Sequence, residues 1–155
     1  IPSLVYAQQV EPDADDIALL RSAIALTVDD ANLDPRHVLE RCVALAQLAV
    51  LANDDAAART WSHRGLAIDP YHATLALTLA RIDDDEAVGP PARDVLAQVV
   101  SQHPTWPDVE AALIRRQLED GRVDEARWRI STWQQRHPNH PHMPETPGRA
   151  QEIAA

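Results

Sequence analysis

The spacing of apolar positions along this chain predicts seven helices separated by short polar turns. Leucine, isoleucine, valine and alanine recur every three to four residues from about residue 15 to residue 136, which is the periodicity of amphipathic helices. The predicted helices run from about 15 to 29, 35 to 52, 56 to 68, 70 to 82, 90 to 102, 105 to 120 and 124 to 136. We therefore expect an all-α domain over residues 14–138, preceded by an extended lead-in or linker (1–13) and followed by a tail rich in proline and histidine (139–155).

Capping residues mark several of the predicted helix ends. Asp34 and Asp69 each precede a proline, a combination that suits an N-cap followed by the first helical residue. Thr105 is predicted to cap the sixth helix, with Asp108 three residues later as in a capping box. Gly121 stands where a left-handed C-cap is expected at the end of that helix.

Four prolines suggest that the helices form repeated units. Pro35, Pro70, Pro104 and Pro138 are separated by 35, 34 and 34 residues. A period of that length, closed by proline after a helical pattern, is typical of stacked helix pairs. Such stacks build extended surfaces that bind other proteins. The spacing therefore predicts a binding scaffold rather than an enzyme.

The segment at 121–126 (GRVDEA), followed by Ile130 and Pro138, resembles the second half of a tetratricopeptide repeat. The resemblance implies that Gly121 ends one helix, that Ala126 lets two helices approach, and that Pro138 closes the unit. Shifting this frame back by 34 and 68 residues gives the implied structural positions Ala58, Pro70, Ala92, Pro104, Gly121, Ala126 and Pro138. The fold implied is a right-handed α-solenoid of about three degenerate 34-residue helix pairs over residues 39–138, plus an N-terminal helix.

The units depart from the family pattern at several positions. Cys42, Ala76 and Glu110 occupy places where the family carries a large aromatic residue. Asn53 and Ala87 replace the turn glycine of the first two units. We therefore expect the helices to stack at angles that differ from the family norm.

The four tryptophans are Trp61, Trp106, Trp128 and Trp133. We interpret them as packing residues within and between repeats rather than as ligand-stacking residues. Because nothing resembling a solvating cap helix follows the last unit, Trp128 and Trp133 are candidates for an exposed end of the domain.

In the tetratricopeptide family the first helix of each pair lines the concave face, and the resemblance implies three rows of side chains there. The rows are Gln47, Arg81 and Arg115; Val43, Leu77 and Ala111; and Glu40, Thr74 and Asp108. The prediction is a partner-binding groove with an apolar stripe flanked by two arginines. Guanidinium groups one repeat apart suit the carboxylates of an extended or helical peptide.

A second interpretation of these arginines stays open. Arg81 and Arg115 could instead pair with Asp84, Asp85 or Glu119 on their own face of the domain. In that case they would contribute to local stability and would not be available to a partner.

Composition excludes several classes of function. The net charge is −10, and an acidic chain of this kind argues against binding to nucleic acid or to anionic membrane surfaces. The single cysteine, Cys42, excludes an internal disulfide, and no apolar run is long enough for a membrane span. We find no nucleophile with an adjacent base and no glycine-rich phosphate loop, so neither catalysis nor a cofactor is expected.

The expected function is a protein–protein interaction scaffold that binds a protein or peptide, as a module of a larger bacterial protein or assembly. Residues 61–71 (WSHRGLAIDPY) also resemble the tetratricopeptide-like effector domain of bacterial transcriptional activators, which implies an effector or self-association role. A metal- or small-ligand sensor could use His137, His140 and His142, although the prolines between them favour a solvated tail without metal.

The first residue, Ile1, is not methionine, so we expect a fragment or a processed form. A cytoplasmic location is expected, with export or a membrane-anchored parent protein as alternatives. The compartment is not fixed by the single cysteine, because one thiol indicates neither an oxidising nor a reducing environment.

Overall fold

All regular elements between residues 13 and 139, the part of the chain that the computed structural model describes, are α-helices. The helices are α1 (Ala14–Val28), α2 (Pro35–Leu51), α3 (Asp55–Ile68), α4 (Ala73–Leu79), α5 (Ala92–Gln102), α6 (Pro107–Glu119) and α7 (Val123–Arg136). The prediction of an all-α domain with seven helices is confirmed. The predicted lead-in, apart from Asp13, and the predicted tail, apart from Asn139, lie outside the described residues.

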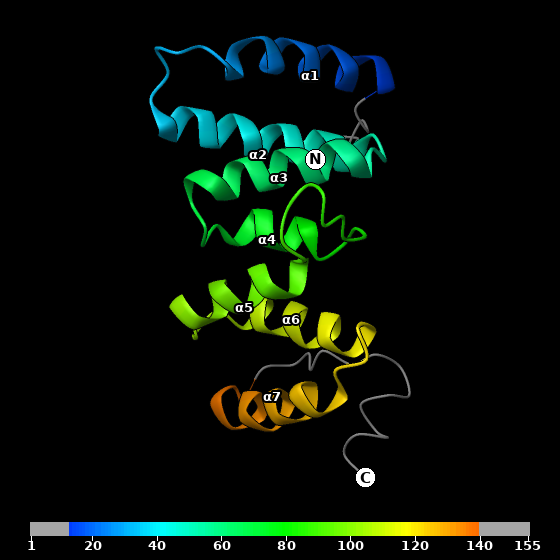
Figure 1. Cartoon of the computed structure of the whole chain (residues 1–155), viewed down its shortest axis with the longest axis vertical. Helices are drawn as coiled ribbons and strands as arrows, with labels where there is room; N and C mark the ends of the chain where they lie inside the picture. Colours follow the sequence, from blue (N-terminus) through cyan, green and yellow to red (C-terminus); the bar gives the residue numbers. More distant parts are fainter. Residues whose placement is uncertain (1–12, 140–155) are drawn as a thin grey trace, which may run out of the picture.

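The helices follow one another along the long axis of the molecule, from α1 at one end to α7 at the other (Figure 1). Each helix packs against the next one in sequence, so the chain forms sequential helix pairs. In addition, α2 packs against α4, and α4 packs against α6. By contrast, within residues 13–139 no Cα atom of α3 or α7 lies within 8 Å of one in α5. The even-numbered helices therefore form a continuous row of contacts that the odd-numbered helices lack.

Aspartate side chains begin two of the central helices. Asp34 accepts a hydrogen bond from the backbone N–H of Arg36 at 2.9 Å, and Pro35 is the first residue of α2, as predicted. Asp54 caps α3 in the same way by accepting from the N–H of Ala57 at 3.1 Å. Both carboxylates satisfy backbone donors that have no partner within their own helix.

Helix α4 is shorter than predicted and begins at Ala73 rather than at residue 70. The carboxylate of Asp69 accepts from the N–H of Tyr71 at 3.1 Å, so it forms a local turn instead of a helix cap. The cap is His72, whose Nδ1 accepts from the N–H of Leu75 at 3.4 Å. Because the turn holds residues 69–71 outside the helix, the predicted cap-and-proline start at this position is wrong.

The predicted capping box at the start of α6 is also wrong. The N-cap is Trp106, and it makes no side-chain capping bond. A residue that precedes proline is driven towards extended backbone, and Trp106 has φ −91° and ψ 97° ahead of Pro107. This restriction leaves Thr105 one residue outside the cap position. The ring of Trp106 instead stacks on His103, with the ring centroids 3.8 Å apart.

Two turns adopt the left-handed backbone that ends helices in Schellman motifs. Gly121 has φ +76°, which confirms the predicted C-cap, and Asn53 has φ +55° at the equivalent place two 34-residue periods earlier. In both turns the N–H of the following residue donates to a carbonyl five residues back, that of Gln117 (2.8 Å) or Ala49 (2.9 Å). Asn53 therefore makes the same turn as the glycine, at the cost of a less favourable left-handed conformation.

The alanines and prolines that the repeat resemblance implies as structural residues lie in two kinds of environment. Ala58, Ala92 and Ala126 are 0%, 1% and 0% exposed, and each belongs to the hydrophobic core. The prolines at 70, 104 and 138 are exposed, and each lies two residues after the end of α3, α5 or α7. The small residues thus lie where helices meet, and the prolines lie in or after the turns that follow them.

The three positions that lack the family's aromatic residue are fully buried. Cys42, Ala76 and Glu110 are each 0% exposed. Burial raises the pKa of the Cys42 thiol, an effect that the positive charge of Arg64 only partly offsets, so the thiol stays protonated. The Glu110 carboxylate forms an ion pair with Arg136, which joins α6 to the end of α7.

The two tryptophans of α7 have opposite environments. Trp133 is 1% exposed and packs with Ile114, Leu118 and Ile130 between α6 and α7, so the prediction that it marks an exposed end is wrong. Trp128 is 63% exposed, as predicted. The two residues lie five positions apart on one helix and therefore point to different sides of it.

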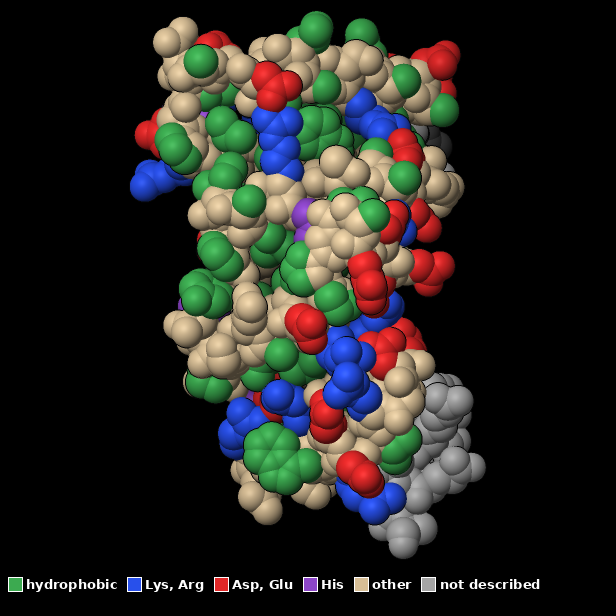
Figure 2. All heavy atoms as spheres, viewed as in Figure 1, with side chains coloured by type: hydrophobic (Ala, Val, Ile, Leu, Met, Phe, Trp, Pro, Cys, Tyr) green, Lys and Arg blue, Asp and Glu red, His purple; other side chains and the backbone are tan. Residues whose placement is uncertain are grey.

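The types of side chain exposed on the face shown in Figure 2 change along the length of the molecule. Hydrophobic side chains stand out along the upper edge, where Figure 1 places α1, and acidic side chains lie at both of its corners. Basic and acidic side chains gather over the lower half of the molecule. None of the helices within residues 13–139 is long and apolar enough to span a membrane.

Candidate partner-binding groove

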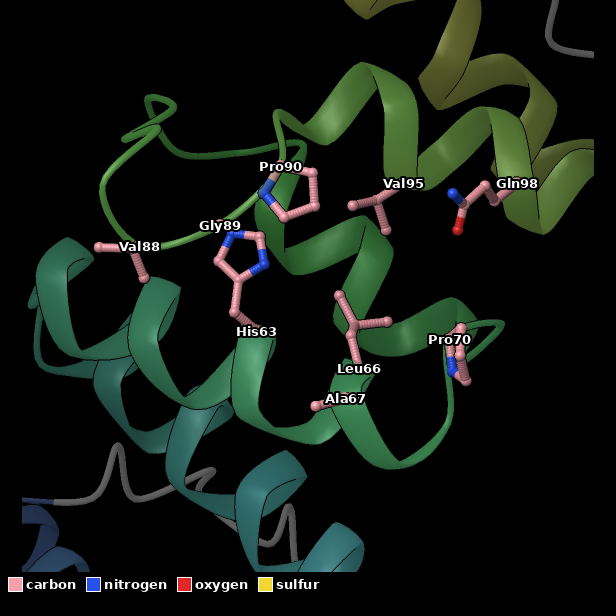
Figure 3. Close-up of a pocket in the computed structure, with 9 residues that line it drawn as sticks. All are labelled: His63, Leu66, Ala67, Pro70, Val88, Gly89, Pro90, Val95 and Gln98. Atoms are coloured by element: carbon pink, nitrogen blue, oxygen red, sulfur yellow. The ribbon is translucent and has the colours of Figure 1, made fainter.

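An apolar hollow of about 280 Å³ lies between α3, α5 and the turn that precedes α5 (Figure 3). Its walls include Leu66, Val88, Pro90 and Val95, and its main polar side chain is His63. The imidazole lies against the backbone of the turn, and a Cβ added at residue 89 would fall 2.5 Å from the ring Nδ1. A larger residue at position 89 would displace the His63 ring, so glycine is what lets this ring pack between the turn and α3.

The environment of His63 favours its neutral form. Burial lowers the pKa of the imidazole, and the positive charge of Arg59 lowers it further, while Asp84 acts in the opposite direction. A neutral imidazole inside an apolar hollow can donate one hydrogen bond and accept one. The hollow is at the small end of the range for ligand pockets, and we place the candidate site elsewhere.

A larger groove of about 630 Å³ lies between α4 and α6. It is lined by Leu77, Ala80, Arg81, Ile82, Asp83, Asp108, Ala112, Arg115, Arg116 and Glu119. Leucine and alanine side chains give it an apolar strip, and charged residues of both signs surround that strip. The groove exists because α4 and α6 pack directly against each other and present one side together.

Four of the nine predicted partner-binding residues line this groove, namely Leu77, Arg81, Asp108 and Arg115. The other five lie outside it: Glu40, Gln47 and Thr74 are exposed, Val43 is half-buried and Ala111 is buried. The structure therefore brings together members of the predicted rows from α4, from the turn just after it and from α6. The α2 members do not contribute to the groove, and Ala111 has no surface to offer a partner.

The guanidinium groups of Arg81 and Arg115 are exposed in the groove. Among residues 13–139 neither group forms a hydrogen bond or an ion pair. The alternative in which they pair with nearby acids is therefore not what the structure shows, because Asp84 and Glu119 pair with Arg116 instead. As far as residues 13–139 are concerned, both arginines are available to an outside group.

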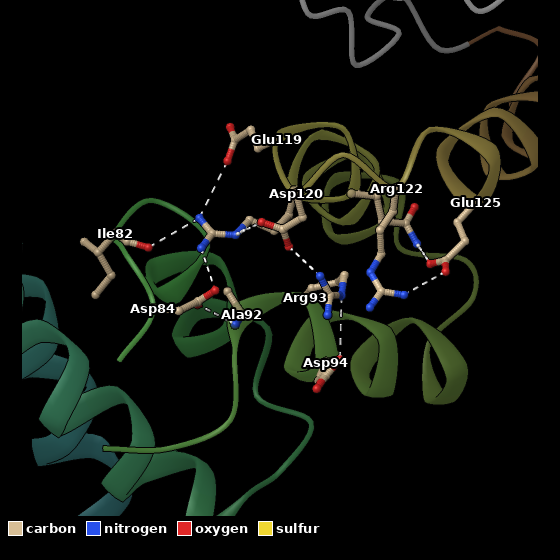
Figure 4. Close-up of polar contacts among 11 residues, drawn as sticks. Ile82, Asp84, Ala92, Arg93, Asp94, Glu119, Asp120, Arg122 and Glu125 are labelled. Atoms are coloured by element: carbon tan, nitrogen blue, oxygen red, sulfur yellow. Dashed lines mark hydrogen bonds and ion pairs between the residues drawn. The ribbon is translucent and has the colours of Figure 1, made fainter. Parts of the chain in front are cut away.

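Arg116, which was not among the predicted groove residues, also lines the groove and is surrounded by acidic side chains. Three of these acids, Asp84, Glu119 and Asp120, are labelled in Figure 4. The Arg116 guanidinium lies 2.7 Å from Asp84, 3.6 Å from Glu119 and 3.7 Å from Asp120. It also donates to the carbonyl oxygen of Ile82 at 3.5 Å. With its side chain only 11% exposed and surrounded by these oxygens, Arg116 has little capacity for a further ligand.

Asp84 ties the groove wall to the start of α5. Its second carboxylate oxygen accepts from the backbone N–H of Ala92 at 2.8 Å, at a helix end that has no cap of its own. Burial by itself would raise the pKa of Asp84, but this hydrogen bond and the ion pair with Arg116 outweigh burial and hold the pKa below its ordinary value. The pair therefore stays charged at neutral pH, and Asp84 links Arg116 on α6 to the start of α5.

Arg93 extends the same network towards the turn between α6 and α7. Its guanidinium lies 2.8 Å from Asp120, so that carboxylate is shared between Arg93 and Arg116. Networks of this kind add positional order as well as attraction. Arg116 forms three ion pairs, whereas Arg115 beside it forms none within residues 13–139, and this contrast is the main electrostatic feature of the groove.

The histidines proposed as metal ligands do not form a described site. The ring of His137 is tilted against Trp133, with the centroids 5.3 Å apart, and His140 and His142 lie outside the described residues. Among residues 13–139, no three histidine, cysteine, aspartate or glutamate side chains come together in a metal-binding arrangement.

No protein-family model matches the chain, and no curated protein or solved structure shows significant similarity to it. The resemblance to tetratricopeptide repeats therefore rests on the residue pattern of this sequence and has no support from these comparisons.

Proposed function

We propose that this chain is a degenerate tetratricopeptide-like repeat domain that binds an acidic segment of a partner protein in the groove between α4 and α6. The observation that carries the proposal is the pair Arg81 and Arg115. These residues are one 34-residue period apart, face the same groove, and have no acidic partner among the described residues.

Three features support the repeat architecture. Buried alanines recur at 34-residue intervals, and the turns at Asn53 and Gly121 share one hydrogen-bonding pattern. The contacts of α2 with α4 and of α4 with α6 are compatible with helices on the inner side of a curved stack. We propose that this stack is a right-handed solenoid with the groove on its concave face.

An acidic segment suits the groove for electrostatic reasons. Arg115 is on α6, and Arg81 lies in the turn just after the end of α4. Because packed helix axes lie about 8–10 Å apart, these two guanidinium groups can contact carboxylates on one short peptide. Leu77 and Ala112 offer an apolar strip to an aliphatic side chain between those carboxylates. Asp83, Asp108 and Glu119 would repel a uniformly acidic chain, so the favoured ligand has a few well-placed acids.

Selection from a random peptide library on the immobilised domain tests this proposal. We expect the selected peptides to combine acidic and aliphatic residues and to bind less tightly as salt is added, because salt screens exposed charges. Arg81→Glu with Arg115→Glu should weaken binding by about tenfold or more, since each charge-assisted hydrogen bond is worth about 1.5–3 kcal/mol.

The matched control is Arg36→Glu with Arg127→Glu. Both residues are exposed and lie outside the groove, and the change in net charge is the same. If both double variants bind the selected peptides equally well, the groove is not the site. A selected set without enrichment in aspartate or glutamate would contradict the proposed ligand class.

The partner itself can be identified by capture from a native lysate with the same pair of variants. A protein that binds the wild type and the control, but not the groove variant, is the expected partner of the parent protein or assembly. We propose no catalytic role and no cofactor for the chain.

A further inference from the structure

The two ends of the helix stack present different outer surfaces. At one end, the side of α7 that faces away from its core residues carries Asp124, Ser131 and Gln135 in addition to the exposed Trp128. At the other end, α1 exposes Leu19 and Leu26, which are 69% and 84% accessible. Terminal helices of stacked repeats need a polar outer face for solubility. By this measure the outer side of α7 is mostly polar, whereas the outer side of α1 is not.

The exposed leucines lie on one continuous strip of α1. With 3.6 residues per turn, Ile17 and Val28 face α2, where both are buried. The opposite side of the helix carries Leu19, Ser22, Ala23 and Leu26, all of them exposed. We refer to these four residues as the α1 face.

The α1 face carries no charge. The single charged residue between positions 17 and 28 is Arg21, which lies on the α2 side and pairs with Asp54 at 2.7 Å. Acidic residues flank the face at both ends, with Asp15 and Asp16 before it and Asp29 after it. A neutral strip of this kind is unusual on a chain with a net charge of −10.

We propose that the α1 face pairs with the α1 face of a second copy of this chain about a two-fold axis. Leu19 and Leu26 are seven residues apart, with the small residues Ser22 and Ala23 between them. In an antiparallel pair centred on those small residues, each leucine lies near a leucine of the other copy and the helices approach closely. Such a surface is complementary to itself, as a two-fold interface requires.

Charge and size both bear on the choice of a second copy. Two chains that each carry −10 repel one another, and the uncharged α1 face adds no like charges of its own between its flanking acids. A standard interface buries about 800 Å² per partner from some 20–30 residues, and one 15-residue helix supplies a fraction of that area. The dimer is therefore expected to be weak and to depend on concentration.

The acids at the two ends of α1 give the dimer a distinctive salt dependence. In an antiparallel pair, Asp15 and Asp16 of one copy approach Asp29 of the other, and like charges at this distance repel. Asp29 is only partly neutralised by its ion pair with Arg64, since its side chain stays 74% exposed. Salt screens this repulsion, so dimerisation should strengthen as sodium chloride is added.

Sedimentation velocity of the chain 1–155, over a range from about 1 µM to about 1 mM and at low and high salt, tests the proposal. The expected result is a monomer–dimer equilibrium whose dimer fraction rises with protein and with salt concentration. Leu26→Glu should remain monomeric under the same conditions. Leu51→Glu is the matched control, because Leu51 is 57% exposed near the end of α2, outside the α1 face.

Two results would overturn the proposal: a wild-type protein that is monomeric throughout, or a Leu26→Glu variant that dimerises as the wild type does. Oxidative cross-linking provides a second readout at the expected two-fold axis. The Ala23→Cys variant should form a disulfide-linked dimer, whereas Leu51→Cys should not, and the native Cys42 is buried and does not interfere. Equal cross-linking of the two cysteine variants would also count against the α1 face.

This inference is independent of the proposed groove, because no residue of α1 lines it. The α1 face can therefore fail its test while the groove passes, and the reverse is equally possible. If both hold, each dimer presents two grooves, and a partner with two acidic segments gains avidity.

Discussion

Replacing Ala126 by leucine tests the helix register most directly. Ala126 is 0% exposed and lies in the cluster formed by Ile114, Leu118, Ile130 and Trp133 between α6 and α7. Leucine adds three carbon atoms at a point where the two helices meet and no space is accessible to solvent. Overpacking of this kind costs about 1–3 kcal/mol of unfolding free energy. For a chain of this length that is a fall in melting temperature of about 2–12 °C.

Urea unfolding followed by circular dichroism measures the effect, with Arg127→Leu as the control. Arg127 is the next residue on the same helix and is exposed, so its replacement should change the stability by less than about 0.5 kcal/mol. Ala58→Leu and Ala92→Leu should behave as Ala126→Leu does, because both alanines are equally buried. If Ala126→Leu unfolds at the same urea concentration as Arg127→Leu, our account of the α6–α7 contact is wrong.

Two further predictions concern buried polar groups. Arg136→Met should lower the unfolding free energy by about 3 kcal/mol or less, because it leaves the fully buried Glu110 carboxylate unpaired while Arg136 itself is partly exposed. The double variant Glu110→Met with Arg136→Met should recover most of that loss. If urea unfolding shows no recovery, the pairing is refuted. His63 has a pKa below its ordinary 6.5, so the unfolded chain binds a proton that the folded chain does not, and stability should fall as pH drops below 6.5. The melting temperature of His63→Gln should depend less on pH over that range, and identical profiles would argue against a half-buried neutral imidazole.

The helices could be predicted from the sequence because their signals are local. Apolar periodicity and the cap at Asp34 depend on residues within one or two turns of each other, and the structure reproduces them. The start of α4 could not be predicted, because Asp69 has two uses for its carboxylate that look alike in sequence. It can cap a helix or close a turn onto Tyr71, and the second is what occurs.

The candidate site shows where sequence reasoning reaches its limit. The 34-residue frame predicts that Arg81 and Arg115 share a face, and both line the groove. It says nothing of Arg116, whose partner Asp84 lies 32 residues away in a turn that belongs to no helix. Adjacent arginines on a helix differ by about 100° in direction. Arg116 faces the acids, while Arg115 forms no ion pair within residues 13–139, and only the fold determines this difference.

The opposite salt dependences of the two proposed surfaces make them separable in one experiment. Binding in the groove brings unlike charges together at Arg81 and Arg115, so added salt weakens it. Pairing through the α1 face brings like charges together at Asp16 and Asp29, so added salt strengthens it. A salt titration of the wild type with a selected peptide should therefore shift the protein from peptide-bound monomers towards peptide-free dimers. A titration in which both equilibria move in the same direction would show that at least one of the two surfaces has been assigned incorrectly.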